Sequence, residues 1–330
     1  MANNTEATSS LVLFTSLNGY EVTAPLLAIN GVILLIGILT LVSNAYVLDT
    51  VVRRTSLEAT DLVMCHLAVT DMLTGVLVIH TVGYNLINFQ NFTECLMRLG
   101  VVFTFVCCSV NHLALLTVDR FVKIVFPYRY QDIISRKSVS IISAAIWVFS
   151  VNLGLIPAYG WRHTPEPSEP ACSLLGVLTA GYIQMGLSII YLPFVLICIL
   201  YMKIFLVVRR HSRAIAATDI SGNSNSGSSM KFTKTVVILI GAYIISFSPL
   251  AMIALVFTFG GFHDVSAFAV GDYIVYASVL TFANSLVNPI IYSFKLPPVR
   301  RRLLRFLGKS DNSLNSTTSG TVQTVVTDVD

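Results

Sequence analysis

Leu116-Thr117-Val118-Asp119-Arg120-Phe121 closes a long apolar run that begins near Gly100. Adjacent acidic and basic residues at the end of so apolar a stretch are costly to bury, and ionisable residues at membrane depth are candidates for function. At about 1.5 Å per residue, a helix from Cys95 to Arg120 would be roughly 37 Å long. That slightly exceeds the ~30 Å hydrocarbon core of a bilayer. The stretch therefore predicts a membrane-spanning helix with a cysteine at one face and an Asp-Arg pair at the other.

The composition is that of a membrane protein. Hydrophobic residues make up 55% of the chain and charged residues only 12%, whereas soluble domains carry about 25% charged residues. The mean hydropathy is +0.76. We therefore predict an all-α membrane protein, a seven-transmembrane helix bundle over residues 24–293. The seven apolar segments long enough to span a bilayer are 24–52, 59–86, 95–128, 138–160, 176–210, 231–259 and 268–293.

The positions of the basic residues predict the orientation of the bundle. With residues 1–23 as an extracellular N-terminus, only Arg98 and Arg162 of the 21 Lys and Arg residues fall on the outer side. This distribution fits the excess of basic residues in cytoplasmic loops. Residues 294–308 have the pattern of a short amphipathic eighth helix on the inner leaflet. Residues 309–330 are rich in Ser and Thr and predict a disordered cytoplasmic tail.

Residues spread over all seven segments resemble the pattern of rhodopsin-like (class A) G-protein-coupled receptors. Asp119-Arg120-Phe121 with Pro127 is similar to the family's Asp-Arg-Tyr motif, and the segment 288–292 matches its Asn-Pro-x-x-Tyr motif. The other matching positions are Asn44, Asp71, Cys95, Trp147, Cys172, Pro193 and Pro249. The resemblance covers about residues 25–307. It leaves the subfamily unassigned, with a weak likeness to the adenosine-like and lipid-receptor branch.

The resemblance implies a receptor, not an enzyme, that binds an extracellular ligand and activates heterotrimeric G proteins. Phe121 replaces the family's tyrosine and Phe247 its tryptophan. Ser229 stands where many members carry an acid that pairs with the arginine matched by Arg120, so we expect signalling without ligand. The residues expected to control coupling and activation are Asp119, Arg120, Phe121, Pro127, Tyr201, Phe247, Pro249, Asn288, Pro289 and Tyr292.

Asp71 is the acid expected near mid-membrane, where a lone carboxylate must be paired, protonated or bound to an ion. One acid with several neutral oxygen donors suits a small hard cation or a cluster of water molecules. In the resembled family the matching positions form an allosteric sodium site. We therefore expect sodium, with a water network as the alternative and no other cofactor. The expected ligands are Asp71, Ser109, Asn284 and Asn288.

The resembled family binds ligands among the outer halves of its helices. Val102 replaces the aspartate of biogenic-amine receptors, and Phe282 replaces the retinal-binding lysine of opsins. The expected pocket is mostly apolar, so we predict an orphan or chemosensory receptor for a small, largely apolar ligand. Its expected residues are Thr81, Asn85, Arg98, Val102, Phe103, Val106, Tyr182, Met185, Leu250, Ala254, Ser278 and Phe282.

Two alternatives stay open. A lipid-mediator receptor could hold an anionic headgroup through Arg98, although snorkelling of that arginine to the membrane rim is the favoured interpretation. A membrane transporter is the remote alternative. It would require inverted repeats, broken helices or several intramembrane charges, and the sequence has no visible repeat.

The remaining expectations concern location, partners and modification. We expect the plasma membrane, contact with membrane lipids, and binding of arrestin and receptor kinases through the Ser/Thr-rich tail. No nucleic acid is expected. Asn3-Asn4-Thr5 and Asn91-Phe92-Thr93 are glycosylation sequons on the predicted outer side, so Asn3 and Asn91 are candidate glycan sites.

We predict a disulfide between Cys95 and Cys172, tying the outer end of the third segment to the loop before the fifth. The four other cysteines lie inside apolar runs, where thiols behave as reduced core residues, and the outer face is oxidising. Mass spectrometry of the folded, non-reduced protein should recover the two cysteine peptides linked. Free thiols at both positions in surface-expressed protein would contradict the prediction.

Overall fold

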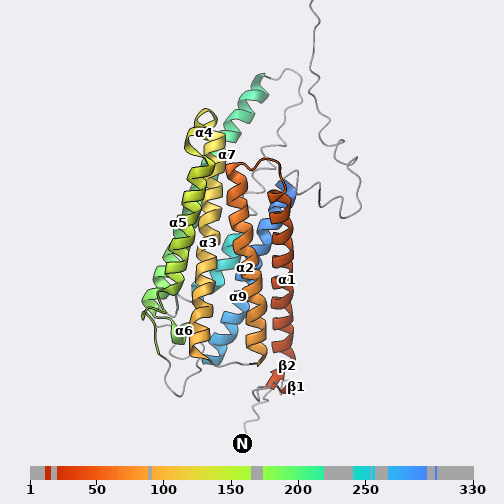
Figure 1. Cartoon of the computed structure of the whole chain (residues 1–330), viewed down its shortest axis with the longest axis vertical. Coiled ribbons are helices and arrows are strands. Elements are labelled where there is room, and N and C mark those ends of the chain that lie inside the picture. Colours follow the sequence, from red (N-terminus) through yellow and green to blue (C-terminus); the bar gives the residue numbers. More distant parts are fainter. Residues whose placement is uncertain are drawn as a thin grey trace, which may run out of the picture.

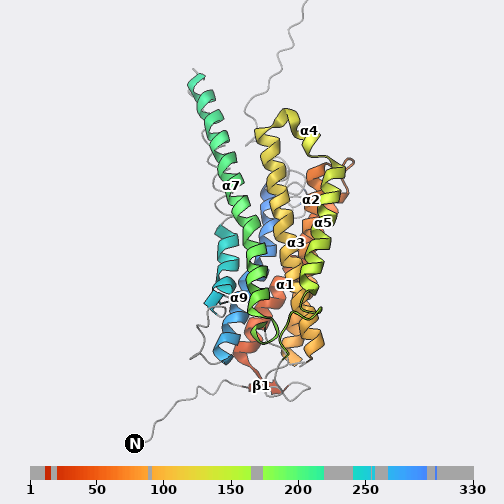
Figure 2. The same cartoon turned by 90° about the vertical axis from the view of Figure 1, so that its left-hand side faces the viewer.

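The computed structural model describes residues 12–15, 21–87, 91–164, 174–218, 241–253, 255–256, 267–295 and 302. Its long helices run side by side as one bundle (Figures 1 and 2). They are α1 (Ala24–Val52), α2 (Ala59–Ile87), α3 (Phe92–Val125), α5 (Arg136–Leu155), α7 (Ala180–Thr218) and α9 (Ala267–Lys295). A further apolar helix covers Gly241–Ile253. The short elements are the 3-10 turn η1 (Pro127–Arg129), α4 (Tyr130–Ile133) and α6 (Leu174–Val177).

Two short strands precede the bundle, an addition to the expected all-helical fold. Strand β1 (Val12–Thr15) pairs antiparallel with β2 (Glu21–Thr23), and β2 runs directly into α1. Figure 1 places this hairpin at the end of the bundle opposite α4. We call the two ends the hairpin end and the α4 end. In the orientation predicted from the basic residues, the α4 end faces the cytoplasm.

The helix bounds follow local sequence signals. Asn91 caps α3 by accepting the Glu94 N–H at 2.9 Å, and Ser135 opens α5 with a capping box. Both helices end before residues 128 and 160, the limits expected from hydropathy. Pro127 forces Phe126 out of helical geometry, with φ −128° and ψ 56°. Pro157 lacks the N–H that would continue α5.

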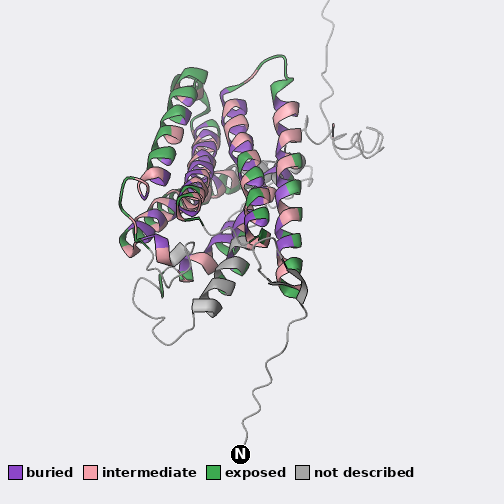
Figure 3. Ribbon diagram, turned by 60° about the horizontal axis from the view of Figure 1, so that its bottom comes forward, coloured by how far each residue is buried: buried purple, intermediate pink, exposed green. Residues whose placement is uncertain are grey.

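The described helices have the apolar character needed to cross a membrane. Among the described residues, five are long and apolar enough, namely α1, α2, α3, α5 and the Ala180–Arg210 part of α7. Shorter apolar helices cover Gly241–Ile253 and Val279–Ile290. Figure 3 shows buried faces turned inward and exposed faces outward, and the outward faces carry large hydrophobic side chains such as Leu35 and Val148. Apolar faces of this kind are suited to lipid. Each of these seven apolar helices corresponds to one of the seven expected spans.

Two pairs of glycines allow the helix backbones to approach closely. A Cβ on Gly75 of α2 would lie 2.9 Å from the Gly37 carbonyl oxygen of α1. A Cβ on Gly154 of α5 would overlap the Gly100 carbonyl oxygen and the Thr104 hydroxyl of α3. Small residues permit such contact between membrane helices. These seams fix α1 against α2 and α3 against α5.

Most of the predicted eighth helix, and the predicted tail 309–330, lie outside the described residues. Arg302 is described, and its guanidinium lies over the Tyr46 ring at 5.1 Å. Its Nη2 is 2.5 Å from Asp49 Oδ2, and its Nη1 donates to Thr50 Oγ1 at 2.9 Å. Arg302 therefore packs on the last turns of α1.

Gly154→Ala should destabilise the bundle, because the added methyl group would collide with the Gly100 carbonyl of the α3 backbone as well as with the Thr104 hydroxyl. Overpacking of this kind costs about 1–3 kcal/mol. Gly83→Ala is the matched control, since nothing lies within 4 Å of its Cβ position. Thermal unfolding in detergent should show a lower Tm for Gly154→Ala only. Equal Tm values for the two variants would show that the seam tolerates the methyl group.

Candidate functional site

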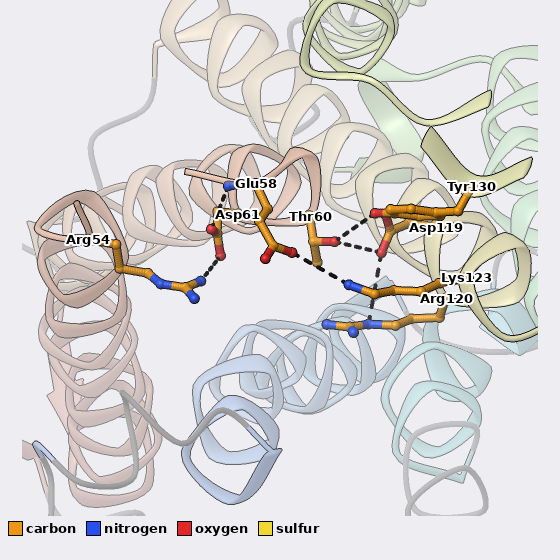
Figure 4. Close-up of polar contacts among 8 residues, drawn as sticks. All are labelled: Arg54, Glu58, Thr60, Asp61, Asp119, Arg120, Lys123 and Tyr130. Carbon is orange, nitrogen blue, oxygen red and sulfur yellow. Dashed lines mark hydrogen bonds and ion pairs between the residues drawn. The ribbon is translucent and has the colours of Figure 1, made fainter. Parts of the chain in front are cut away.

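Asp119 is fully buried near the α4 end of α3, where an ionised carboxylate needs donors. The Thr60 hydroxyl, from the first turn of α2, donates to Asp119 Oδ2 at 2.9 Å. The Tyr130 hydroxyl, from α4, donates to Oδ1 at 2.7 Å. Figure 4 shows both hydroxyls converging on the carboxylate. Asp119 therefore joins α2, α3 and α4 through one side chain.

Arg120 contributes much less to holding that carboxylate. Its Nε lies 4.0 Å from Asp119 Oδ2, and its side chain is 39% exposed. An ion pair at this distance is weaker than the two shorter hydrogen bonds. The expected pairing of Asp119 with Arg120 is therefore present only at the longest distance that still counts as an ion pair. The guanidinium is left largely uncommitted among the described residues (Figure 4).

Tyr130 is held in its protonated form. Burial, partly opposed by the Thr60 hydroxyl, raises the pKa of Tyr130 to about 12. The hydroxyl keeps its proton at physiological pH and remains a donor to Asp119. The Lys123 ammonium lies 5.2 Å from the Tyr130 ring centroid, a cation–π contact that also places the ring.

The turn between α1 and α2 is built around a second buried carboxylate, Asp61. Arg54 Nη1 donates to Asp61 Oδ1, and the Glu58 backbone N–H donates to Oδ2 at 2.8 Å. The Glu58 side chain lies 3.5 Å from Lys123 Nζ on α3. Figure 4 shows these pairs beside the Asp119 cluster. The first turn of α2, which carries Thr60, is therefore held by charged pairs to the end of α1 and to α3.

Three further predicted activation residues are Phe121 of α3, Pro127 of η1 and Tyr201 of α7. Phe121 is half-buried and meets Phe126 edge-on, with ring centroids 5.9 Å apart. Pro127 starts η1. Tyr201 of α7 interacts with Thr117 and lies close enough to Arg120 to feel its charge. Ser229, which carried the expectation of signalling without ligand, lies outside the described residues.

The predicted cation site comes together in part. Asp71 is fully buried. Asn288 Nδ2 donates to its Oδ2 at 2.8 Å, and the Ser109 hydroxyl lies 3.5 Å from its Oδ1. Ser285 is a further hydrogen-bond partner of Asp71. Asn284 is half-buried, and no hydrogen bond to Asp71 is found for it within the described part of the chain.

Asn44 adds a link from α1 to this network. Its Nδ2 donates to the Ser285 carbonyl oxygen at 3.2 Å, while its Oδ1 is buried without a hydrogen-bond partner. No group of three or more His, Cys, Asp or Glu side chains that could hold a metal occurs among the described residues. One carboxylate, two hydroxyls and an amide fit a small hard cation better than a transition metal.

The remaining activation residues lie on α9 and the helix 241–253. Phe247 is buried and packs on Tyr243, with ring centroids 4.5 Å apart. Pro249 is half-buried in the same helix. Pro289 is buried inside α9, one residue after Asn288. Tyr292 also belongs to α9, but its side chain is not among those that the structure describes.

The predicted pocket residues divide between helix packing and interior positions. Tyr182 is fully buried, its hydroxyl donates to the Leu153 carbonyl oxygen at 3.1 Å, and its ring contacts Phe103. Phe282 is buried against α1 and α2. Asn85 Nδ2 donates to Asn30 Oδ1 at 3.2 Å. Half-buried positions are Thr81, Val102, Val106, Met185 and Leu250, while Ala254 and the Ser278 side chain lie outside the description.

Arg98 is tied to neighbouring side chains. Its Nε lies 3.0 Å from Glu94 Oε1, and only 11% of its side chain is exposed. The guanidinium stacks over Tyr84 at 4.0 Å, and His80 Nε2 meets the same Glu94 oxygen at 3.0 Å. An anionic headgroup would have to displace Glu94. This geometry disfavours headgroup binding through Arg98.

The modification sites remain predictions. Cys95 is disulfide-bonded, but Cys172, its predicted partner, lies outside the described residues. Cys65, Cys107, Cys108 and Cys198 are free, as expected. Asn91 is exposed while capping α3, and Asn3 lies outside the description.

Thr60, Tyr130 and Ser285 were not predicted from the sequence as members of these networks. No sequence spacing links Thr60, in the first turn of α2, or Tyr130, ten residues after Arg120, to Asp119. Ser285 follows Asn284 directly, and helix rotation rather than residue type decides which of the two meets Asp71. The pairing of His66 with His112, whose rings stack 5.3 Å apart between α2 and α3, was not predicted either.

Comparison with known proteins agrees with this arrangement. The model of the 7 transmembrane receptor (rhodopsin family) matches residues 43–292. Adenosine receptor A3 of Bos taurus is 25% identical over 288 residues, covering 83% of this chain and 87% of that protein. Adenosine receptor A2b of Gallus gallus is 26% identical over 325 residues, 90% of this chain and 94% of that protein. G-protein coupled receptor 6 of Homo sapiens is 28% identical over 240 residues, which cover 72% of this chain and 63% of that protein. The chain therefore belongs to the rhodopsin family of seven-transmembrane receptors, plasma-membrane proteins that signal through heterotrimeric G proteins and are not enzymes.

Proposed function

We propose that Arg120 engages the G protein when the α4 end of the bundle opens, and that the Asp119 cluster holds the resting state. The observation that carries this proposal is the hydrogen-bonding of Asp119. Thr60 and Tyr130 satisfy the carboxylate at 2.9 and 2.7 Å, while Arg120 is 4.0 Å away and 39% exposed. A ligand that favours the open state shifts the population toward it. The N-terminus then lies outside and the C-terminus in the cytoplasm, where arrestin and receptor kinases would meet the tail.

For the ligand we propose a small, largely apolar molecule that enters from the hairpin end. Support comes from the aromatic and aliphatic side chains of Phe103, Val106, Met185, Phe247 and Phe282 on the predicted wall. Two of the charges near that end, Glu94 and Arg98, already neutralise each other. An orphan or chemosensory role fits such a pocket. Two relatives are named adenosine receptors, but at 25–26% identity this likeness does not extend to the ligand.

A lipid mediator is the second candidate ligand. It would be recognised by its apolar chain, with its headgroup competing for Arg98. The partly buried Glu94–Arg98 pair makes that competition costly. Membrane lipids are better proposed as partners of the basic segment that begins after α9, because Arg302 already packs at the α4 end of α1.

The coupling proposal is tested by guanine-nucleotide exchange on a heterotrimeric G protein, using membranes that contain the receptor and no added ligand. Arg120→Ala should reduce exchange to the level of receptor-free membranes. Arg136→Ala, an exposed arginine at the same end of the bundle, is the control and should leave exchange unchanged. Equal exchange by wild type and Arg120→Ala, at matched surface expression, would rule out the proposed role of Arg120.

Tyr130→Phe should raise exchange without ligand, because it removes the 2.7 Å hydrogen bond that holds Asp119 in the resting arrangement. A hydrogen bond to a charged group is worth about 1.5–3 kcal/mol, so the active population should rise by roughly tenfold or more. Tyr159→Phe, an exposed tyrosine at the other end of the bundle, controls for the substitution itself. A Tyr130→Phe receptor with wild-type exchange would mean that this contact does not set the resting state.

We also propose that Asp71 binds sodium, and that the bound ion stabilises the resting bundle. Purified receptor should show a higher Tm in sodium chloride than in potassium chloride at the same ionic strength, because an ion that binds only the folded state adds to its stability. Asp71→Asn should abolish the difference, and Asp132→Asn, an exposed acid on α4, should retain it. A wild-type Tm that is the same in both salts would identify the site as a water network.

A further inference from the structure

The turn between α1 and α2 presents a basic sequence followed by hydroxyl groups. It reads Arg53-Arg54-Thr55-Ser56-Leu57, and residues 53–56 are exposed and non-helical. The Arg53 side chain is 73% exposed, and that of Arg54 is 36% exposed. This turn lies at the α4 end of the bundle (Figure 1), which the basic residues place in the cytoplasm. The Ser56 hydroxyl is therefore accessible to cytoplasmic enzymes that use nucleoside triphosphates as substrates.

We propose that Ser56 is phosphorylated by a serine/threonine kinase with an acidic substrate groove. Such a groove binds arginine side chains by charge-assisted, often bidentate hydrogen bonds to its carboxylates. Charge patterns of this kind distinguish kinase substrates. Arg53 and Arg54 lie three and two residues before Ser56, and the apolar Leu57 follows it. The turn is already non-helical, so a kinase need not unwind a helix to bind it.

The reaction is an ordinary phosphoryl transfer. The Ser56 Oγ attacks the γ-phosphorus of the triphosphate, a new O–P bond forms, and the bond between the γ-phosphorus and the bridging oxygen breaks. The nucleoside diphosphate leaves, and the serine proton passes to the catalytic aspartate of the kinase. Ser56 gains a group with a charge of about −1.5 to −2 and three acceptor oxygens.

The two arginines differ in how freely they can leave their present partners. Arg53 Nε contacts Asp49 Oδ1 at 2.6 Å, but Arg302 lies 2.5 Å from the other oxygen of Asp49, so Asp49 keeps a cation when Arg53 leaves. Arg54 pairs with Asp61, whose side chain is only 2% exposed. Freeing Arg54 leaves that buried carboxylate without its cation. The Arg54–Asp61 pair therefore limits access of the kinase to the turn.

The same pair connects phosphorylation to signalling, and this step rests on the proposed role of the Asp119 cluster. A phosphate on Ser56 competes with Asp61 for Arg54. Asp61 and Thr60 are neighbours in the first turn of α2, and Thr60 donates to Asp119. Loosening that turn weakens one of the two hydrogen bonds that hold Asp119. Phosphorylation should therefore raise exchange without ligand, by less than the loss of Tyr130 does.

The chain contains a second copy of the basic pattern, which provides an internal comparison. Arg209-Arg210-His211-Ser212 also places two arginines before a serine, but it is followed by Arg213 and lies within α7. A kinase would have to unwind α7 to read it in extended form. Thr55, next to Ser56, has the arginines one residue closer and lacks a following apolar residue. Ser212 and Thr55 therefore test whether preceding basic residues alone are sufficient for phosphorylation.

The experiment treats the full-length receptor, reconstituted in lipid nanodiscs, with a kinase selective for two arginines before serine and with radiolabelled ATP. Peptide mass spectrometry then locates the phosphate. We expect Ser56 to be modified, and Ser56→Ala to remove most of the label while Ser212→Ala and Thr55→Ala retain it. Arg53→Ala should slow labelling about tenfold, the effect of losing one charge-assisted contact. Asp61→Asn should speed labelling several-fold, because it releases Arg54.

Several results would overturn the proposal. Label confined to Ser212, or no label on folded receptor while the denatured chain is labelled at Ser56, would show that the turn is closed to kinases. Label confined to Thr55 would show that the kinase modifies the neighbouring hydroxyl and not Ser56. Labelling that Asp61→Asn leaves unchanged would remove the gating role of the Arg54–Asp61 pair. Exchange assays on phosphorylated receptor form a separate arm, with an expected rise of about two- to fivefold. Phosphorylated Ser56 with unchanged exchange would refute the coupling to Asp119 while leaving the modification site itself established.

Discussion

A buried carboxylate has to find donors where there is no water, and this constraint organises the receptor. Asp119 and Asp71 both lie on helices that pack in the bundle interior, and both are fully buried. Neither is neutralised mainly by a cation among the described residues. Hydroxyls and amides from neighbouring helices supply their hydrogen bonds instead. Because such groups are costly to leave unpaired in apolar surroundings, each carboxylate fixes the helices that contribute its donors.

The two carboxylates fix different parts of one bundle. Asp71 connects α2 to Ser109 of α3 and to Asn288 of α9, and Asn44 extends that network to α1. Asp119 connects α3 to the first turn of α2 and to α4. The glycine seams between α1 and α2, and between α3 and α5, keep these helices close enough for the hydrogen bonds to form. Movement of α2 or α4 relative to α3 therefore requires rearrangement of the Asp119 donors.

The sequence predicted the fold class and the spanning helices well, because a run of about 20 apolar residues is the length that a membrane-spanning helix requires. Helix ends were overestimated where Pro127 and Pro157 interrupt the backbone ladder. Partners across helices could not be predicted, because they depend on helix rotation and tilt. Ser285 in place of Asn284, and Tyr130 in place of Arg120, are examples. The hairpin of β1 and β2 was missed because strands of four and three residues are too short to show a periodic signal.

The central claim is that Asp119 is held more strongly by Tyr130 than by Arg120. Double-mutant cycles on thermal or chemical unfolding of the purified receptor measure both couplings in the same units. Asp119→Asn is combined with Tyr130→Phe in one cycle and with Arg120→Gln in the other. We predict a coupling of about 1–3 kcal/mol for Asp119 with Tyr130 and below about 1 kcal/mol for Asp119 with Arg120. The reverse order would show that the neighbouring arginine, and not the hydroxyls of α2 and α4, holds the carboxylate in the resting receptor.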